Sequence, residues 1–191
     1  RLEHGCWDVR RAAVNALAQL AVKGDQHTIT AVAASLEDAD SNVRHAAVEA
    51  LVQLAEKGDE HAITAAAARL EHECWDVRCS AVEAVAQLAV KGDQYAIAAV
   101  AARLEDTDWN VRHAAVEALV QLAERGDQNA ITAVATCFED TDLEVRRAAV
   151  EALVQLAEMG DQEVITALAA RLEDTNRDMR NAAVEALAQL A

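Results

Sequence analysis

LEDTDWNVRHAAVEALVQLAERGDQ, residues 104–128, contains one helix together with both of its ends. Apolar residues recur at i, i+3, i+4, i+7, i+8 and i+11, which places them on one face of a helix of about four turns. Asp108 can cap the start of this helix, and Gly126 stands where a left-handed residue would end it. The predicted buried stripe consists of Val111, Ala114, Ala115, Ala118, Leu119 and Leu122.

A second, shorter helix follows directly, and Asp127 can cap it. Its predicted inner face carries Ile131, Val134, Ala135 and Phe138. The chain contains no proline, and no stretch has the alternation of apolar and polar residues that is typical of a strand. The sequence therefore predicts a helical hairpin and an all-α fold.

The hairpin recurs along the chain with a period of 34 residues. Each first helix contains a Val-Arg or Met-Arg pair: Val9-Arg10, Val43-Arg44, Val77-Arg78, Val111-Arg112, Val145-Arg146 and Met179-Arg180. Gly-Asp pairs mark the turns at 24–25, 58–59, 92–93, 126–127 and 160–161. We therefore predict a single array over residues 1–191, with full repeats at 1–34, 35–68, 69–102, 103–136 and 137–170 and a partial repeat at 171–191.

A hairpin of this size cannot bury its apolar stripes alone, whereas stacked hairpins cover one another. The expected fold class is an all-α, right-handed α-solenoid, in which the many alanines allow close helix packing. The chain begins at Arg1 without a methionine, so we expect a fragment or a processed form of a longer protein. The last repeat stops after its first helix, at Ala191, and an open apolar end would favour flanking helices or end-to-end self-association.

The charge and composition of the chain argue against several classes of function. The net charge is −16, which argues against a nucleic-acid partner, because affinity for phosphate comes mainly from clustered Lys and Arg. No apolar run approaches the roughly 20 residues of a membrane span, and no signal segment is visible. Four cysteines without dense spacing favour reduced thiols, so we expect a cytoplasmic protein.

The recurring motif LEDTDxxVRxAAVEALxQLA, followed by the Gly-Asp turn and a second helix, resembles the HEAT repeat over the whole chain. The resemblance is greatest to the short repeats of phycobilisome-lyase-like and artificial HEAT-type arrays. Tetratricopeptide repeats have the same period, but their Trp, Gly, Tyr and Pro signature positions are missing here. The chain departs from HEAT repeats in lacking the proline often found before Val-Arg and in a first helix three residues longer. The resemblance implies a HEAT/armadillo-like superhelix.

The arginines of the Val-Arg and Met-Arg pairs are the most regular polar feature of the chain. The resemblance implies a structural ladder, in which each arginine pairs with acids of a loop. Two sets of acids can supply the partners: those before each first helix, or those of the Gly-Asp turns. A phosphate-binding row is the functional alternative, but the surrounding acids would cancel its charge. The acids of the turns are Asp25, Asp59, Asp93, Asp127 and Asp161.

Differences between repeats concentrate on the face of the first helix opposite the buried stripe, which in HEAT-type arrays lines the concave surface. Trp, Asp or Asn, His or Cys, and Glu occupy this face and describe an acidic groove with an aromatic edge. Such a groove would attract a basic protein or peptide and anchor it on the tryptophans. The predicted partner-binding residues are Trp7, Trp75, Trp109, Asp76, Asn110, His45, Cys79, His113, Glu83 and Glu117.

A structural interpretation of the same residues stays open. Each tryptophan can fold over a loop and shield the edge of the core. The glutamates can form a solvated face, helped by an Arg or His four residues earlier. Trp75 and Trp109, which lie in consecutive repeats, are the pair whose substitution separates the two interpretations.

Reactive residues gather in HECWDVRC, residues 72–79. The His-x-Cys pair of this stretch recurs as His4 and Cys6, two repeats away, so the two pairs cannot share a zinc ion with its roughly four convergent ligands. Cys79 has no counterpart in the first repeat, where Arg11 takes its place. We therefore expect no metal, no cofactor and no catalytic cysteine, since nothing marks a base for a nucleophile.

Two enzyme families of related fold offer an alternative. Deoxyhypusine hydroxylase is a HEAT-type di-iron enzyme with His-Glu pairs directly after Val-Arg, whereas His45 and His113 are followed by Ala46 and Ala114. The phycobilin lyase subunit shares the repeat type, and that likeness rests on fold alone. We expect a non-enzymatic protein–protein interaction scaffold. The alternatives are a non-catalytic or lyase-type subunit of a HEAT-repeat enzyme, and a self-assembling structural array.

Overall fold

A computed structural model describes residues 2–190, and this part of the chain contains eleven α-helices, four short 3-10 helices and no strand. The predicted all-α fold is therefore confirmed. Arg1 and Ala191 lie outside the described residues, and with them the expectations about the two chain ends.

The chain forms two compact halves, which divide between Val100 and Ala101. The N-terminal half contains α1 (Trp7–Leu20), α2 (Gln26–Ala34), η1 (Ser35–Glu37), α3 (Ser41–Leu54), α4 (Glu60–Ala67), α5 (Trp75–Leu88) and α6 (Gln94–Ala101), whose last residue belongs to the other half. The C-terminal half contains η2 (Ala102–Glu105), α7 (Trp109–Leu122), α8 (Gln128–Thr136), η3 (Cys137–Glu139), α9 (Leu143–Leu156), α10 (Gln162–Ala170), η4 (Arg171–Glu173) and α11 (Arg177–Leu190).

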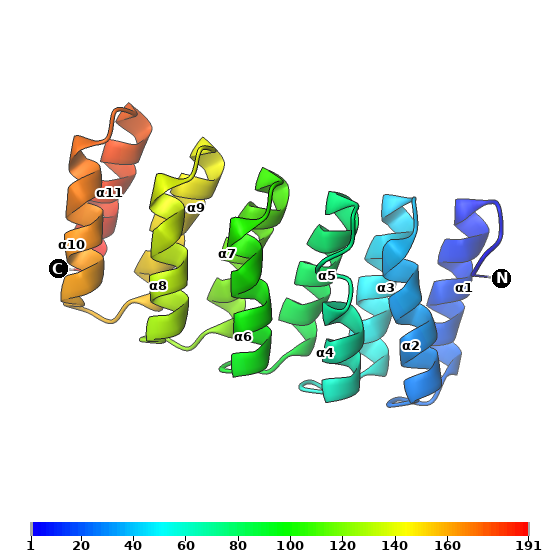
Figure 1. Ribbon diagram of the computed structural model, residues 1–191. Helices are drawn as coiled ribbons and strands as arrows, with labels where there is room; N and C mark the ends of the chain where they lie inside the picture. The colour runs from blue at the N-terminus through cyan, green and yellow to red at the C-terminus, as the bar shows by residue number, and fades with distance from the viewer. Residues whose placement is uncertain (1, 191) are drawn as a thin grey trace. The chain divides into compact units, whose positions relative to one another are not determined.

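Each half has two layers of helices (Figure 1). In the N-terminal half, α3 packs between α1 and α5, and α2 packs against α4. In the C-terminal half, α9 packs between α7 and α11, and α8 packs against α10. The odd-numbered α-helices, which are the first helices of the hairpins, form the first-helix layer of each half. The even-numbered α-helices form its second-helix layer. Hairpins thus stack on one another within each half, as the period predicts.

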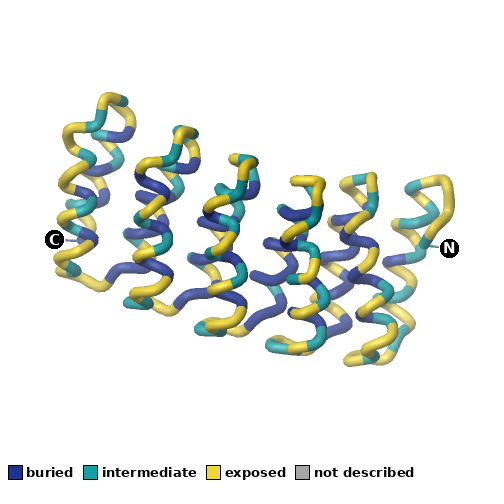
Figure 2. Tube along the Cα trace, viewed as in Figure 1, coloured by how far each residue is buried: buried dark blue, intermediate teal, exposed yellow. Residues whose placement is uncertain are grey.

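The core lies where the two layers meet, and Figure 2 shows the buried residues on the facing sides of the helices. The predicted stripe of α7 is buried except for Ala114, which is half-buried. Val116, which the stripe omits, is only 1% exposed. The reason is that α9 of the next hairpin packs against the side of α7. The apolar spacing within one hairpin does not reveal this contact. In the second helix, Ala135 is half-buried, and the buried Phe138 lies in η3 rather than α8.

The Gly-Asp turns end one helix, begin the next and join neighbouring repeats. All five glycines have φ between +77° and +84°, the left-handed region expected of a residue that ends a helix. The aspartates accept hydrogen bonds from backbone N–H groups in the first turn of the second helix, for example Asp127 from Ala130 at 3.1 Å. The glycine N–H also donates to the last leucine carbonyl of the following first helix, in Gly24–Leu54, Gly58–Leu88, Gly126–Leu156 and Gly160–Leu190.

The repeated arginine fastens the loop that precedes its own helix. In all six repeats its Nη1 donates to the carbonyl oxygen six residues earlier, at 2.7 to 2.9 Å. It also donates to the carbonyl five residues earlier, at 3.0 to 3.3 Å. The guanidinium therefore supplies donors to loop carbonyls that lie outside any helix, and the loop holds one shape in every repeat.

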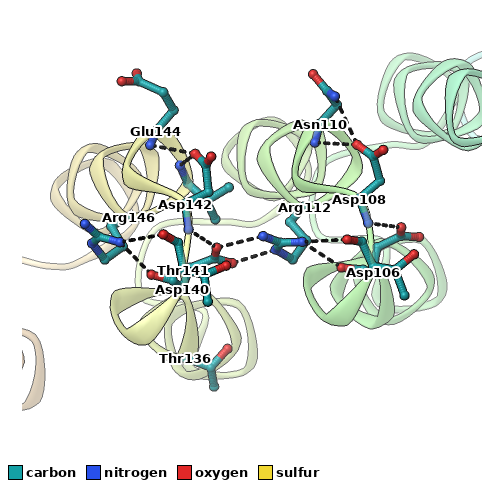
Figure 3. Close-up of polar contacts among 12 residues, drawn as sticks. Asp106, Asp108, Asn110, Arg112, Thr136, Asp140, Thr141, Asp142, Glu144 and Arg146 are labelled. Carbon is teal, nitrogen blue, oxygen red and sulfur yellow. Dashed lines mark hydrogen bonds and ion pairs between the residues drawn. The ribbon is translucent and has the colours of Figure 1, made fainter.

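The other edge of the guanidinium connects consecutive repeats. Arg112 binds Asp140 through Nε at 2.6 Å and Nη2 at 2.8 Å (Figure 3). Arg10 binds Asp38 in the same way, at 2.6 and 2.7 Å. These contacts identify the acids before the next first helix as ladder partners, whereas the aspartates of the Gly-Asp turns serve as helix caps.

These ion pairs keep the carboxylates charged. The hydrogen bond from Arg10 lowers the pKa of Asp38 below its ordinary value. For Asp140, burial raises the pKa, but the hydrogen bonds from Arg112 and from the Asp142 N–H outweigh burial, so the net pKa is lowered. Each aspartate also accepts from the backbone N–H two residues later, at 2.9 Å for Asp40 and 2.8 Å for Asp142.

Asp140→Asn should lower the free energy of unfolding by about 2 kcal/mol, because it removes one charge of a largely buried ion pair. Asparagine keeps an oxygen for the Asp142 N–H, so the loss reports on Arg112. The matched control is Glu139→Gln: Glu139 pairs with Arg171 at 2.7 Å, but its side chain is 78% exposed against 7% for Asp140. The control should cost less than about 0.5 kcal/mol. Equal losses in urea denaturation would contradict the ladder.

Candidate peptide-binding face

The ten predicted partner-binding residues all belong to first helices. Within the N-terminal half they lie on α1, α3 and α5, and within the C-terminal half on α7. The residues of each half therefore belong to its first-helix layer. The positions are Trp7 on α1, His45 on α3, Trp75, Asp76, Cys79 and Glu83 on α5, and Trp109, Asn110, His113 and Glu117 on α7.

A groove of about 300 Å³ runs between α7 and α9 in the first-helix layer. It is called the α7/α9 groove. Its apolar lining is small and aliphatic, and its polar lining consists of charged and amide side chains. The apolar residues are Val116, Val120, Ala148 and Ala152, and the polar residues are His113, Glu117, Gln121, Glu144, Arg147, Glu151 and Gln155.

Four polar groups in this groove form two pairs with each other. Arg147 lies 3.6 Å from Glu144, and His113 lies 3.7 Å from Glu117. Glu151 contacts no cation within residues 2–190. The α7/α9 groove therefore has a net negative charge, with one carboxylate free to meet a ligand.

A second groove, of about 270 Å³, follows between α9 and α11 and is called the α9/α11 groove. Glu151 and Gln155 line both grooves, so the two are neighbours on one surface. The only charged residues in the lining of the second groove are Glu151 and Glu185. Its remaining lining consists of Val150, Val154, Gln155, Ala182, Ala186 and Gln189.

Trp109 lies at the loop edge of this layer rather than in a groove. It lines a hollow of about 310 Å³ with Asp108, Arg112 and Asp142, beside the loops drawn in Figure 3. Its ring meets the ring of His113 edge-on, with centroids 6.5 Å apart, and His113 lines the α7/α9 groove. Trp109 remains 43% exposed, so much of its surface is open to a ligand.

The other two tryptophans differ from each other. Trp75 is 40% exposed at the start of α5. Trp7 is half-buried, and the guanidinium of Arg11 lies 5.1 Å from the centre of its ring. An intramolecular cation thus already occupies the position over Trp7 that a basic ligand would take.

Several predicted residues are engaged in the scaffold. Asn110 donates both its backbone N–H and its side-chain amide to Asp108, at 2.9 and 3.0 Å. Glu83 accepts from Gln87 at 3.1 Å. His45 lies 3.5 Å from Glu49, four residues later on the exposed side of α3. The spacing of residues predicts that these groups lie opposite the buried stripe, but it does not distinguish a side chain engaged in a helix cap from a free one.

One rung of the arginine ladder is incomplete. His72 stands where Asp38 and Asp140 bind the preceding arginine, so Arg44 has no bidentate partner. Arg44 is only 5% exposed, its Nε has no hydrogen-bond partner within residues 2–190, and its Nη2 lies 3.5 Å from Asp76. The predicted ligand-contacting Asp76 therefore compensates a buried arginine.

The histidines of the His-x-Cys pairs shape loops. His72 Nδ1 accepts from the Cys74 N–H at 3.1 Å, and His4 accepts from Cys6 in the same way. This is the hydrogen bond that aspartate makes in the other loops. Within residues 2–190, no three His, Cys, Asp or Glu side chains converge where they could hold a metal ion.

The four cysteines are free thiols in different surroundings. Cys6 and Cys74 are exposed before their helices, and Cys79 is half-buried. Burial raises the pKa of the Cys137 thiol to about 11, which makes it a poor nucleophile at neutral pH. None of the helices in the described part of the chain has the length and apolar character needed to span a bilayer.

Comparison with known proteins identifies the family and the fold class of this chain. The profile of HEAT repeats matches residues 1–86, 63–153 and 118–188. No curated protein matches the sequence. A designed armadillo repeat protein in complex with the peptide (KR)4 is 19% identical, with a TM-score of 0.63, and the match covers 100% of this chain and 96% of that chain.

Two further solved structures have the same fold. A computationally designed armadillo repeat protein for modular peptide recognition is 18% identical with a TM-score of 0.59, covering 100% of this chain and 97% of that chain. In the complex of CpcE and CpcF of phycocyanin lyase from Nostoc sp. PCC7120, the matching chain is 21% identical with a TM-score of 0.66. That match covers 85% of this chain and 99% of the other. These matches confirm the HEAT/armadillo-type α-solenoid class.

His72→Asp should stabilise the chain by about 1 kcal/mol, because aspartate can complete the buried pair with Arg44 and keep the hydrogen bond from Cys74. His72→Asn is the matched control: it keeps the hydrogen bond but adds no charge, so it should leave the unfolding midpoint nearly unchanged. Thermal denaturation followed by circular dichroism measures both. A stabilisation that is equal in the two variants would show that the missing carboxylate does not limit this rung.

Proposed function

This chain belongs to the HEAT-repeat family, and we propose that it is a non-catalytic scaffold that binds a basic peptide segment on its first-helix layer. The observation that carries the proposal is the pair of grooves in the C-terminal half. They lie side by side, combine small aliphatic side chains with acidic ones, and share the unpaired Glu151. Lys and Arg side chains have an aliphatic stem and a cationic head, the two features that such a groove complements.

Charge and fold support the same partner. The net charge of −16 would attract a cationic segment and increase its rate of association. A designed armadillo repeat protein of similar fold is solved in complex with (KR)4, an alternating Lys-Arg peptide. The free thiols suit a reducing compartment, so we place this activity in the cytoplasm.

In this proposal each half provides one tryptophan anchor for a bound segment, Trp75 on α5 in the N-terminal half and Trp109 on α7 in the C-terminal half. Both are about two-fifths exposed at the N-terminal ends of first helices. Tryptophan contributes a large apolar surface at little cost in side-chain entropy, which makes it a frequent hot spot in interfaces. Trp7 contributes less, because Arg11 already covers its ring.

Fluorescence anisotropy of dye-labelled (KR)4 tests the proposal. The peptide should bind the chain with an affinity that falls as salt is added, and an (ED)4 peptide of the same length should not bind. The double variant Trp75→Ala/Trp109→Ala should bind (KR)4 about tenfold more weakly with an unchanged far-UV circular dichroism spectrum. Tyr95→Ala is the control, because Tyr95 is 57% exposed on α6 in the second-helix layer.

Three outcomes would contradict parts of this proposal. Absence of (KR)4 binding at low salt would overturn the basic partner. A loss of binding in Tyr95→Ala equal to that of the tryptophan variant would place the site on the other layer. Loss of helicity in the tryptophan variant would assign these rings to shielding of the core edge.

A lyase-type subunit is the second candidate, and the likeness to the CpcE–CpcF complex of phycocyanin lyase is the observation in its favour. The two functions differ in a simple readout. A peptide scaffold should leave the absorption spectrum of an added bilin unchanged, whereas a lyase-type subunit should shift it on binding.

A further inference from the structure

Four polar side chains of the C-terminal half form a row of glutamates and a row of glutamines. Glu151 and Glu185 are exposed on α9 and α11, and Gln155 and Gln189 lie one turn further along the same helices. All four side chains line the grooves, and none of these side chains makes a hydrogen bond or ion pair within residues 2–190. A ligand that crosses α9 and α11 would therefore meet a carboxylate and an amide on each helix.

The spacing of the helices sets the spacing of the ligand. Packed helix axes lie roughly 8–10 Å apart, so consecutive grooves take cations about that far apart. In a β-strand, residues i and i+2 point to the same face but lie only about 6.8 Å apart, and residue i+3 points to the opposite face. Three residues of a polyproline II helix span about 9.3 Å and complete one turn, so residues i and i+3 point to the same face.

Gln155 and Gln189 distinguish the two remaining ligand conformations, the α-helix and the polyproline II helix. An α-helical ligand can present residues i and i+7 about 10.5 Å apart, but its backbone groups are satisfied internally. A polyproline II segment has no internal hydrogen bonds, so its carbonyls are free to accept from side-chain amides. Gln155 and Gln189 are exposed donors beside the two cation sites. The amide row thus gives the polyproline II backbone partners that an α-helix would not use.

We propose that the first-helix layer of the C-terminal half binds a polyproline II segment that carries Lys or Arg at every third residue. One cation enters the α7/α9 groove and the next enters the α9/α11 groove. In each groove the aliphatic stem covers Val and Ala side chains while the cationic head meets Glu151 or Glu185. This inference rests on the proposed function and adds the conformation and spacing of the ligand.

Two labelled peptides of identical composition test the spacing. One is Lys-Pro-Pro repeated four times, and the other is Lys-Pro repeated four times followed by four prolines. Anisotropy titrations with the full chain at low ionic strength should give an affinity about tenfold higher for the Lys-Pro-Pro peptide. Its polyproline II circular dichroism signal should be retained in the complex.

Charge variants locate the site. Glu151→Gln/Glu185→Gln should weaken binding of the Lys-Pro-Pro peptide about tenfold. The control Glu163→Gln removes one carboxylate from α10, in the second-helix layer of the same half, and should change the affinity less than twofold. An equal loss in the control would overturn the assignment to these grooves.

The experiments distinguish a failure of this inference from a failure of the proposed function. If (KR)4 binds the chain but the two proline peptides bind equally, or the Lys-Pro peptide binds more tightly, the three-residue spacing is wrong and the proposed function stands. If neither (KR)4 nor either proline peptide binds, the proposed function and this inference both fall. A helical signal induced in a bound (KR)4 peptide would replace polyproline II with a helical ligand.

Discussion

The hydrogen bonds from each repeated arginine to the loop before its own helix are the constraint on which the rest depends. Six guanidinium groups make the same pair of bonds to loop carbonyls, and those of Arg10 and Arg112 also bind a carboxylate of the next repeat in bidentate fashion. Because the same carbonyls are bonded in each loop, every first helix begins in the same hydrogen-bonding frame. The Gly N–H bonds to the following leucine carbonyls fasten the opposite end.

A frame held at both ends leaves the exposed side of the first helices free to vary. Its variable residues are the ones that contact solvent, and in the C-terminal half they line two consecutive grooves. Different side chains of α7 therefore have different surroundings: Val111, Arg112 and Leu119 belong to the frame, while His113 and Glu117 line the α7/α9 groove.

The sequence predicts the fold well because its signals are local and repeat. The helix caps, the left-handed glycines and the apolar stripe all appear within one period, and the structure confirms them. Burial of Val116 and the Gly126–Leu156 bond involve the neighbouring repeat, so one hairpin does not reveal them. For the candidate site, helical phase predicts which side of each first helix is exposed. The contact between Asp76 and Arg44 joins two repeats, and the sequence signal that accompanies it is His72, which replaces an aspartate 28 residues after that arginine.

Amide NMR with a spin-labelled (KR)4 peptide would locate the binding layer most directly. We predict paramagnetic broadening of amides on α7, α9 and α11, strongest around Glu151, with the signals of α8 and α10 retained. Because α7, α9 and α11 form one layer of the C-terminal half and α8 and α10 form the other, this comparison of signals needs no substituted variant. Broadening confined to α8 and α10, or spread evenly over both layers, would contradict a binding face on the first helices.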